Sequence, residues 1–222
     1  MLNVKIIKSW KRTSISVKVD EYAQIIVKAP KWVLNNKINS ILNENRQWIE
    51  KRIKLVKKNK INKKRFNNKE EHLYLGIKYK LYIIKNQEIP FYFKNGFYLL
   101  EKNKKKAKTY FEEWYKKQAL EIISEKVKYY SQKYNIKYKS IKLSNAKTKW
   151  GSCTNRQRLR FSWQIIMAPE DVINYLIIHE ITHIQESNHS KKYWNKVKEK
   201  EPDYKKYEKW LRKNGSLLHI FT

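Results

Sequence analysis

Residues 179–189 read HEITHIQESNH, an HExxH pattern with a third histidine six residues after its last one. On an α-helix, positions i and i+4 lie one above the other, so His179 and His183 would point two imidazole nitrogens at a single ion. Glu180 lies beside that face, where its carboxylate can reach a water molecule at the ion without binding the ion itself. The stretch therefore predicts a catalytic zinc site with His179, His183 and His189 as metal ligands and Glu180 as general base.

The third ligand depends on how the chain continues after the helix. The helix must stop after His183 and the chain must reverse for His189 to reach the same ion. Ser187 and Asn188 are turn residues, and asparagine tolerates the left-handed backbone that a reversal needs. We favour His189 because it gives the compact spacing. A carboxylate could bind instead, as in zinc enzymes with two His ligands and one Glu, and the candidates are Glu186, Glu199, Glu201 and Glu208.

The segment that carries the pair has the pattern of a buried helix. Pro169 suits a first helical turn, and Glu170 and Asp171 favour the positive end of the helix dipole. Apolar residues then cover most of the cylinder: Val172, Ile173, Leu176, Ile177, Ile178, Ile181 and Ile184. Two unpaired imidazoles in such an interior would be costly, which favours a bound ion over histidines that only fill the core.

Short motifs flank the HExxH pattern on both sides. They read KWGSC (149–153), LRFSW (159–163), IMAP (166–169), NHS (188–190) and YW (193–194). In the N-terminal half, SISV (14–17), VKAP (27–30) and LYLG (73–76) continue the match. Together these motifs resemble the YgjP-like bacterial metallopeptidases, which are similar in their catalytic segment to the SprT-like and Spartan proteases.

The resemblance implies a zinc-dependent fold and fixes a role for each residue of the motif. The residues that align with His179, His183 and His189 bind the metal in this family, and the one that aligns with Glu180 is catalytic. One departure is Tyr193, where the family usually shows Phe, and which brings a hydroxyl group near the third ligand.

Length and composition narrow the class of protein. A chain of 222 residues fits one domain, or a catalytic domain with an N-terminal extension, and is long enough for a sizeable core. It has no apolar run of about 18 residues, and Lys5, Lys8, Lys11 and Arg12 interrupt its start, so we expect a cytoplasmic protein without a membrane segment. Cys153 is the only cysteine, which excludes an intrachain disulfide and favours a small packed side chain over a nucleophile.

The formal net charge is +31 at pH 7. A charge of this size ordinarily indicates nucleic acid or another polyanion as a partner. Here the excess is mostly lysine in a chain that is also rich in asparagine and isoleucine, as expected from an AT-rich genome. The charge therefore favours acidic partners at low salt without establishing nucleic-acid binding.

Arg156, Arg158 and Arg160 recur at every second position. In a strand they would share one face, with Leu159 and Phe161 on the other. Such a row is either a solvated strand face or an edge that holds substrate carbonyls or an acidic chain near the metal.

Periodicity in the N-terminal half predicts strands around one helix. Alternating residues over 14–19 and the apolar run over 25–27 indicate paired strands. Apolar positions then recur at helical spacing from Leu34 to about Lys57. Residues 73–100 return to β character, and Asn95-Gly96 predicts a hairpin turn because both residues accept a positive φ.

The C-terminal half reads as helices around a small sheet. Apolar spacing predicts a long helix from about Lys104 to Tyr134 that packs against the metal-binding helix. Strands are expected over 140–144 and 158–163, with a turn at 150–152 leading into the second. Ser190 is the predicted N-cap of another helix, and a last helix is expected near the end.

These elements predict an α+β fold. Residues 1–100 would form an N-terminal β-rich region with one helix, and residues 101–222 a zincin-like metallopeptidase domain with a small sheet and the HExxH helix. The edge of that sheet would form one wall of the active-site cleft.

The sequence thus predicts a zinc-dependent peptidase that acts on proteins or peptides, with Glu180 moving a proton from the attacking water to the leaving amine. Charge on the carbonyl oxygen needs a donor besides the metal, and the candidates are Tyr193, Arg160 and Lys149. Two alternatives remain open: a nucleic-acid-associated protease that acts on DNA-bound proteins, and a non-catalytic metal-binding module. A closed structural site of the second kind needs a fourth protein ligand, and Cys153 is the only cysteine available. The oligomeric state is not indicated.

Overall fold

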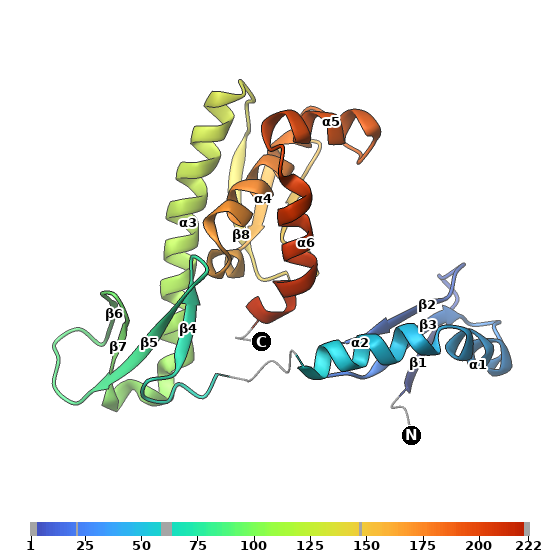
Figure 1. The fold of residues 1–222 in the computed structure, drawn as a ribbon, viewed down its shortest axis with the longest axis horizontal. Coiled ribbons are helices and arrows are strands. Elements are labelled where there is room, and N and C mark those ends of the chain that lie inside the picture. Colours follow the sequence, from blue (N-terminus) through green and yellow to red (C-terminus); the bar gives the residue numbers. More distant parts are fainter. Residues whose placement is uncertain (1–3, 21, 59–63, 147, 220–222) are drawn as a thin grey trace. The chain divides into compact units, whose positions relative to one another are not determined.

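Two large apolar cores organise the chain, one on each side of residue 62. The structure, a computed structural model, describes residues 4–20, 22–58, 64–146 and 148–219. The chain divides into unit 1, Met1–Asn62, and unit 2, Lys63–Thr222 (Figure 1). This division comes earlier than the predicted boundary between residues 100 and 101, because the strands before residue 100 share a core with the helix after it.

Unit 1 combines a three-stranded sheet with two helices. Its elements are β1 (Val4–Ser9), β2 (Ser16–Val19), β3 (Ile25–Pro30), α1 (Asn35–Glu44) and α2 (Arg46–Lys58). β3 is the central strand: β2 pairs with it, as predicted, in an antiparallel arrangement, and β1 pairs with it parallel. Apolar side chains of β2 and β3 pack against Ile38 of α1 and Ile49 of α2, which closes a core on one face of the sheet.

The single helix expected from Leu34 to about Lys57 is two helices. α1 ends at Glu44, and Asn45 has φ −99° and ψ 12°, outside helical geometry. The Asn45 side chain donates from Nδ2 to the carbonyl of Ile41 at 2.8 Å, and such side-chain bonds to the backbone compete with helix continuation. Because α2 starts again at Arg46, the apolar spacing runs across the break and hides it.

Unit 2 carries the HExxH segment. Its elements are β4 (Glu71–Tyr74), β5 (Ile77–Ile84), β6 (Phe91–Phe93), β7 (Phe97–Leu100), η1 (Glu101–Lys106), α3 (Ala107–Lys133), β8 (Ser140–Ser144), β9 (Gly151–Cys153), β10 (Arg158–Ser162), η2 (Trp163–Met167), α4 (Glu170–Thr182), α5 (Lys191–Lys200), α6 (Tyr204–Asn214) and η3 (Gly215–Leu218), where η marks a 3₁₀ helix. The strands form two sheets, in the orders β4-β5-β7-β6 and β8-β10-β9.

The first sheet contains the predicted hairpin at Asn95-Gly96. Phe93 pairs with Phe97 across the turn. Of the two turn residues only Asn95 has a positive φ, of 53°, so the turn uses one left-handed residue rather than two. The hairpin is confirmed, and its aromatic residues join the core beside α3.

A second tight turn ties this sheet to the start of α4. Leu75 and Gly76, which join β4 to β5, both have a positive φ. Their backbone N–H groups donate to the carbonyls of Ile166 at 2.9 Å and Met167 at 3.2 Å, in the segment just before α4. The turn therefore fixes where the HExxH helix begins.

α3 is the central support of unit 2, as predicted for residues 104–134. It buries every fourth side chain: Ala107, Phe111, Tyr115, Ala119, Ile123, Val127 and Ser131. It contacts η2, α4 and β8, and Figure 1 shows it as the long helix beside them. The predicted packing of the long helix on the HExxH helix is confirmed.

The second sheet brings an edge strand to α4. β8 pairs with β10 parallel, and β9 pairs with β10 antiparallel. The strands predicted over 140–144 and 158–163 are confirmed, but most of the turn expected at 150–152 is the strand β9. Three residues with small side chains show no alternation, so pairing with β10 rather than local pattern makes them a strand. β9 lies at the sheet edge and contacts α4.

Small sheets and helices in one chain confirm the predicted α+β class. Within the described residues, none of the helices combines the length and the apolar character that crossing a bilayer requires.

Candidate metal centre

α4 positions the first two histidines because its sequence is apolar on nearly every side. Pro169, expected in the first turn, is instead the N-cap residue just before it. Glu170 and Asp171 lie in the first turn, as predicted. The helix ends at Thr182, and His183 is the C-cap residue, with φ −63° and ψ −17°. The chain then turns before α5 begins, as the third histidine requires.

The reversal brings the three histidines together. Nε2 of His189 lies 3.1 Å from Nε2 of His183 and 3.3 Å from Nε2 of His179. Among the described residues, these three form the set whose side-chain donor atoms could hold one metal ion. His179 and His183 are half-buried and His189 is exposed, so the cluster opens to solvent on the side of His189.

The donor geometry fits a tetrahedral zinc ion. Zinc binds imidazole nitrogen at about 2.0–2.1 Å, which places two nitrogens of a tetrahedral site about 3.4 Å apart. The two observed separations, 3.1 and 3.3 Å, lie close to that value. Because no fourth donor among the described residues joins the set, an ion held there would keep one coordination position without a protein ligand.

Two of the three imidazole rings, those of His179 and His183, are in the protonation state that a metal needs. Nδ1 of His183 lies 3.1 Å from the carbonyl oxygen of Glu186. Since a carbonyl only accepts, Nδ1 carries the proton and Nε2 keeps its lone pair. Burial lowers the pKa of His179 to about 3 and also lowers the pKa of His183. Both rings are therefore neutral at pH 7 and able to bind a cation.

Two aromatic residues of α5 hold the rings in place. The Tyr193 ring stacks on His183 with centroids 4.4 Å apart, and the Trp194 ring stacks on His189 at 5.5 Å. The Tyr193 hydroxyl donates to the backbone carbonyl of His179 at 3.0 Å. α5 thus contacts all three histidines through two adjacent side chains.

The sequence did not reveal this supporting role. Tyr193 was a candidate oxyanion donor, but it is fully buried and its hydroxyl is engaged with the backbone of His179. Ser190 is the residue from which this role could have been inferred. Its side chain caps α5, as predicted, and accepts a hydrogen bond from the backbone N–H of Tyr193. A cap fixes where a helix starts, and so places the residues three and four positions later.

Glu180 is a residue of α4, and its side chain is buried. Burial raises the pKa of Glu180 to about 8, and the positive charge of Lys149 opposes this shift. One carboxylate oxygen, Oε2, has no hydrogen-bond partner among the described residues. A cation held by the three histidines would favour the ionised form of Glu180, whose free oxygen could then accept a proton from a water molecule within its reach.

The rival metal ligands lie outside the cluster. The Glu186 carboxylate pairs with Lys192 at 2.8 Å and Lys196 at 3.5 Å, while only its backbone carbonyl serves the site. The thiol of Cys153 lies 3.5 Å from the carbonyl of Thr154. In the described part of the chain, none of the following joins the donor set: Cys153, Glu199, Glu201, Glu208. A closed structural site therefore lacks its fourth protein ligand there.

The arginine row is partly a strand face. Arg158 and Arg160 lie on the exposed side of β10, and Leu159 and Phe161 on the buried side, so the predicted alternation is confirmed. Arg156 precedes the strand and lies in a turn. The row is therefore two residues long within the sheet.

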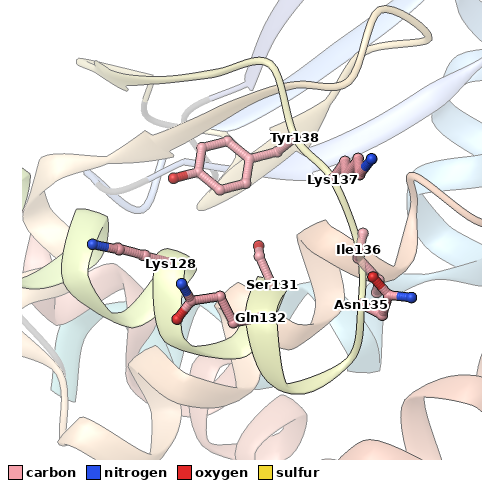
Figure 2. A pocket seen from close by; sticks show the side chains of 7 residues that line it. All are labelled: Lys128, Ser131, Gln132, Asn135, Ile136, Lys137 and Tyr138. Atoms are coloured by element: carbon pink, nitrogen blue, oxygen red, sulfur yellow. The ribbon is translucent and has the colours of Figure 1, made fainter.

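A separate hollow lies at the C-terminal end of α3 (Figure 2). It has a volume of about 420 Å³, and its lining residues are Lys128, Ser131, Gln132, Asn135, Ile136, Lys137 and Tyr138. Lys128 and Lys137 extend in opposite directions, so their charges do not converge. The hollow shares no residue with the histidine cluster and is not part of the candidate site.

Comparison with known proteins identifies the family of this chain. The model of a family described as "YgjP-like, metallopeptidase domain" matches residues 13–214. The crystal structure of the metallopeptidase zymogen of Methanocaldococcus jannaschii jannalysin is similar at 21% identity, over 41% of this chain and 95% of that chain, with a TM-score of 0.38. No curated protein matches the chain.

Proposed function

The chain belongs to the YgjP-like metallopeptidase family and is a metal-dependent hydrolase, and on this premise we propose that it uses zinc to hydrolyse peptide bonds. Its substrates are proteins or peptides, as membership of a peptidase family implies. The observation that carries the choice of zinc is the histidine cluster, with Nε2 separations of 3.1 and 3.3 Å and no fourth ligand among the described residues. Zinc prefers imidazole ligands in tetrahedral sites, and its catalytic sites keep one position open.

Each residue has one task in the proposed reaction. His179, His183 and His189 hold the ion through Nε2. A zinc ion there would supply Lewis acidity to a water molecule and to the scissile carbonyl. The Glu180 carboxylate takes a proton from the attacking water at one oxygen and delivers it to the nitrogen of the leaving amine.

The variant Glu180→Gln tests the role of the carboxylate. Glutamine keeps the shape of the side chain but cannot take up the proton, so we expect unchanged zinc content and about 100-fold to 10,000-fold slower hydrolysis. Zinc is measured by elemental analysis, and cleavage with a mixed peptide library read by mass spectrometry. Glu170→Gln is the matched control, because Glu170 lies on the same helix, exposed and paired with Lys126 at 3.3 Å. Full turnover by the purified Glu180→Gln protein would remove Glu180 from the mechanism.

The variant His179→Ala tests the ligand assignment. Loss of one of three ligands should lower the zinc content well below one ion per chain. Unchanged stoichiometry would count against His179 as a ligand. If the unaltered, zinc-loaded protein cleaves no member of the library, the non-catalytic metal-binding module is the better description.

A further inference from the structure

β9 passes so close to Glu180 that position 151 has no room for a side chain. A Cβ atom built on Gly151 would lie 2.6 Å from Cγ and 2.7 Å from Cδ of Glu180, and closer still to Oε1. Real Cβ atoms essentially never come within 3.0 Å of such neighbours. The carboxyl group of Glu180 therefore rests against the backbone of β9.

The backbone conformation of Gly151 does not require glycine. Gly151 is not one of the described residues with a positive φ, so any L-residue could adopt its conformation. It also lies within a strand, where glycine is disfavoured because it has no side chain to pack. A glycine in a strand often marks a close approach, and here the approaching group is the carboxyl group of Glu180.

β9 is held on two sides and cannot easily retreat from Glu180. On the sheet side, it pairs with β10, and the N–H of Ser162 donates to the carbonyl of Trp150 at 2.7 Å. On the other side, the Trp150 indole stacks on the His219 imidazole, with centroids 4.6 Å apart and planes 12° from parallel. The Trp150 ring also lies directly over Gly215, where a built Cβ would come within 3.1 Å of it.

We propose that Gly151 is a positioning residue for Glu180: the bare backbone of β9 fixes where the carboxylate lies, and any side chain at position 151 moves it. The inference rests on the catalytic role proposed for Glu180. The carboxylate is the group that yields, because it is the end of a flexible side chain whereas β9 is held by β10 and Trp150. All three atoms nearest to the built Cβ belong to Glu180 and none to a histidine, so the substitution acts on the carboxyl group and should leave the histidine cluster in place.

The variant Gly151→Ala separates this role from folding and metal binding. A misplacement of about 1 Å can cost about 100-fold in rate, so kcat should fall by about that factor while KM and zinc content stay near those of the unaltered protein. The kinetics use one library peptide that the unaltered protein cleaves. Ser152→Ala is the control, because neighbouring side chains of a strand point to opposite faces, and it should keep kcat.

A double variant tests the contact itself. Glu180→Asp shortens the side chain by one methylene, and should cost activity in the unaltered protein because the carboxylate falls short. Aspartate still carries a Cγ atom where the built Cβ comes within 2.6 Å of one, so the shorter side chain does not relieve the clash. In Gly151→Ala the carboxylate is already displaced, so adding Glu180→Asp should cost far less than it does alone. Equal losses in both backgrounds would mean that residues 151 and 180 act independently, and would overturn the proposal.

Stability gives a readout that does not depend on turnover. Gly151→Ala should lower the Tm of the metal-free protein, and adding Glu180→Ala should restore it because the collision is gone. A Tm that stays low in the double variant would place the strain elsewhere and contradict the inference. If Gly151→Ala keeps the kcat of the unaltered protein while Glu180→Gln is inactive, only the positioning role of Gly151 is wrong. If Glu180→Gln still turns over, the proposed function itself is wrong.

Discussion

Tyr193 is the residue on which the geometry of the histidine cluster depends most. Its ring stacks on His183, and its hydroxyl donates to the carbonyl of His179. Its backbone N–H donates to the side chain of Ser190, the N-cap residue of α5. The resemblance to the family implies Phe at this position, so the hydroxyl is a departure in this chain. The hydroxyl adds a direct link between α5 and the backbone of His179.

The variant Tyr193→Phe measures that link. Loss of one hydrogen bond should lower the free energy of unfolding by about 1 kcal/mol, and a displaced ligand should weaken zinc binding about tenfold. Hydrolysis at saturating zinc should continue, because the aromatic ring remains. Zinc titration with a competing chelator gives the Kd, and Tyr129→Phe on exposed α3 surface is the control. Equal zinc affinities in the two variants would show that the hydroxyl does not support the site.

His72 is the other residue with an unusual environment. It is fully buried, and its ring stacks on Phe111 at 4.3 Å and on Phe66 at 5.6 Å. Neither ring nitrogen has a hydrogen-bond partner among the described residues. Burial lowers the pKa of His72 to about 3, and the charge of Lys64 adds to the effect. The imidazole is therefore held neutral in the core of unit 2.

Because the pKa of His72 is lowered on folding, the free energy of unfolding depends on pH. The pKa of His72 is ordinarily 6.5 and is about 3 in the folded chain. Between these two pH values His72 is protonated in the unfolded chain and neutral in the folded chain. The free energy of unfolding should therefore fall as pH drops through this window, by up to about 1.4 kcal/mol per pH unit from this residue. His72→Phe should show a shallower fall in urea denaturation between pH 6.5 and 4. Parallel curves for the two proteins would contradict the assignment.

At the scale of elements, the turn between β4 and β5 sets the position of α4. Gly76 has φ +80°, and a Cβ there would lie 2.8 Å from Cα and 3.0 Å from N of Pro169. Both are backbone atoms that cannot swing away. Gly76→Ala should therefore destabilise the protein by about 2–4 kcal/mol and lower zinc affinity by shifting the start of α4.

The comparison for this variant is Gly96→Ala. Gly96 has no positive φ, and a Cβ built there would meet the Tyr82 ring at 2.9 Å and the Lys80 carbonyl oxygen at 3.2 Å. Its one contact below 3.0 Å is therefore with a side chain and not with backbone atoms. Thermal melts should show a clearly larger loss for Gly76→Ala than for Gly96→Ala. A similar Tm for both would mean that the turn does not fix α4.

Strong local patterns made several elements predictable from the sequence. The stripe of α3, the apolar surface of α4 and the Ser190 cap each follow from residue spacing or capping chemistry, and the structure places them accordingly. The convergence of His179, His183 and His189 was predictable because i, i+4 spacing and a turn leave little freedom.

Other features depend on contacts that are distant in sequence. β1 was not predicted because it is defined by parallel pairing with β3, and β9 because its strand character comes from β10. The break at Asn45 leaves the apolar spacing unchanged, so periodicity alone could not show it. The division at residue 62 reflects which core the aromatic strands join, and the space required at Gly151 depends on the approach of β9 to α4.

At the scale of the whole molecule, the net charge of +31 predicts weak, sequence-independent binding to polyanions. Gel shifts with a random DNA duplex should show binding in dilute buffer that weakens steeply as salt rises, because neutralised phosphates release counterions. Neutral dextran of similar size is the control and should not bind. Absence of DNA binding even in dilute buffer would remove the nucleic-acid-associated alternative, whereas binding that resists salt would favour it over charge alone.

The central claim is that one zinc ion binds jointly to three imidazoles of this molecule, with one position left open. Anomalous diffraction at the zinc edge, from protein crystallised with zinc, tests it most directly. We expect one peak about 2.0–2.1 Å from Nε2 of each of His179, His183 and His189, with no fourth protein atom bound. The account would be contradicted if the Cys153 thiol or a carboxylate bound the ion at this peak. It would also be contradicted if no peak lay between the three imidazole rings.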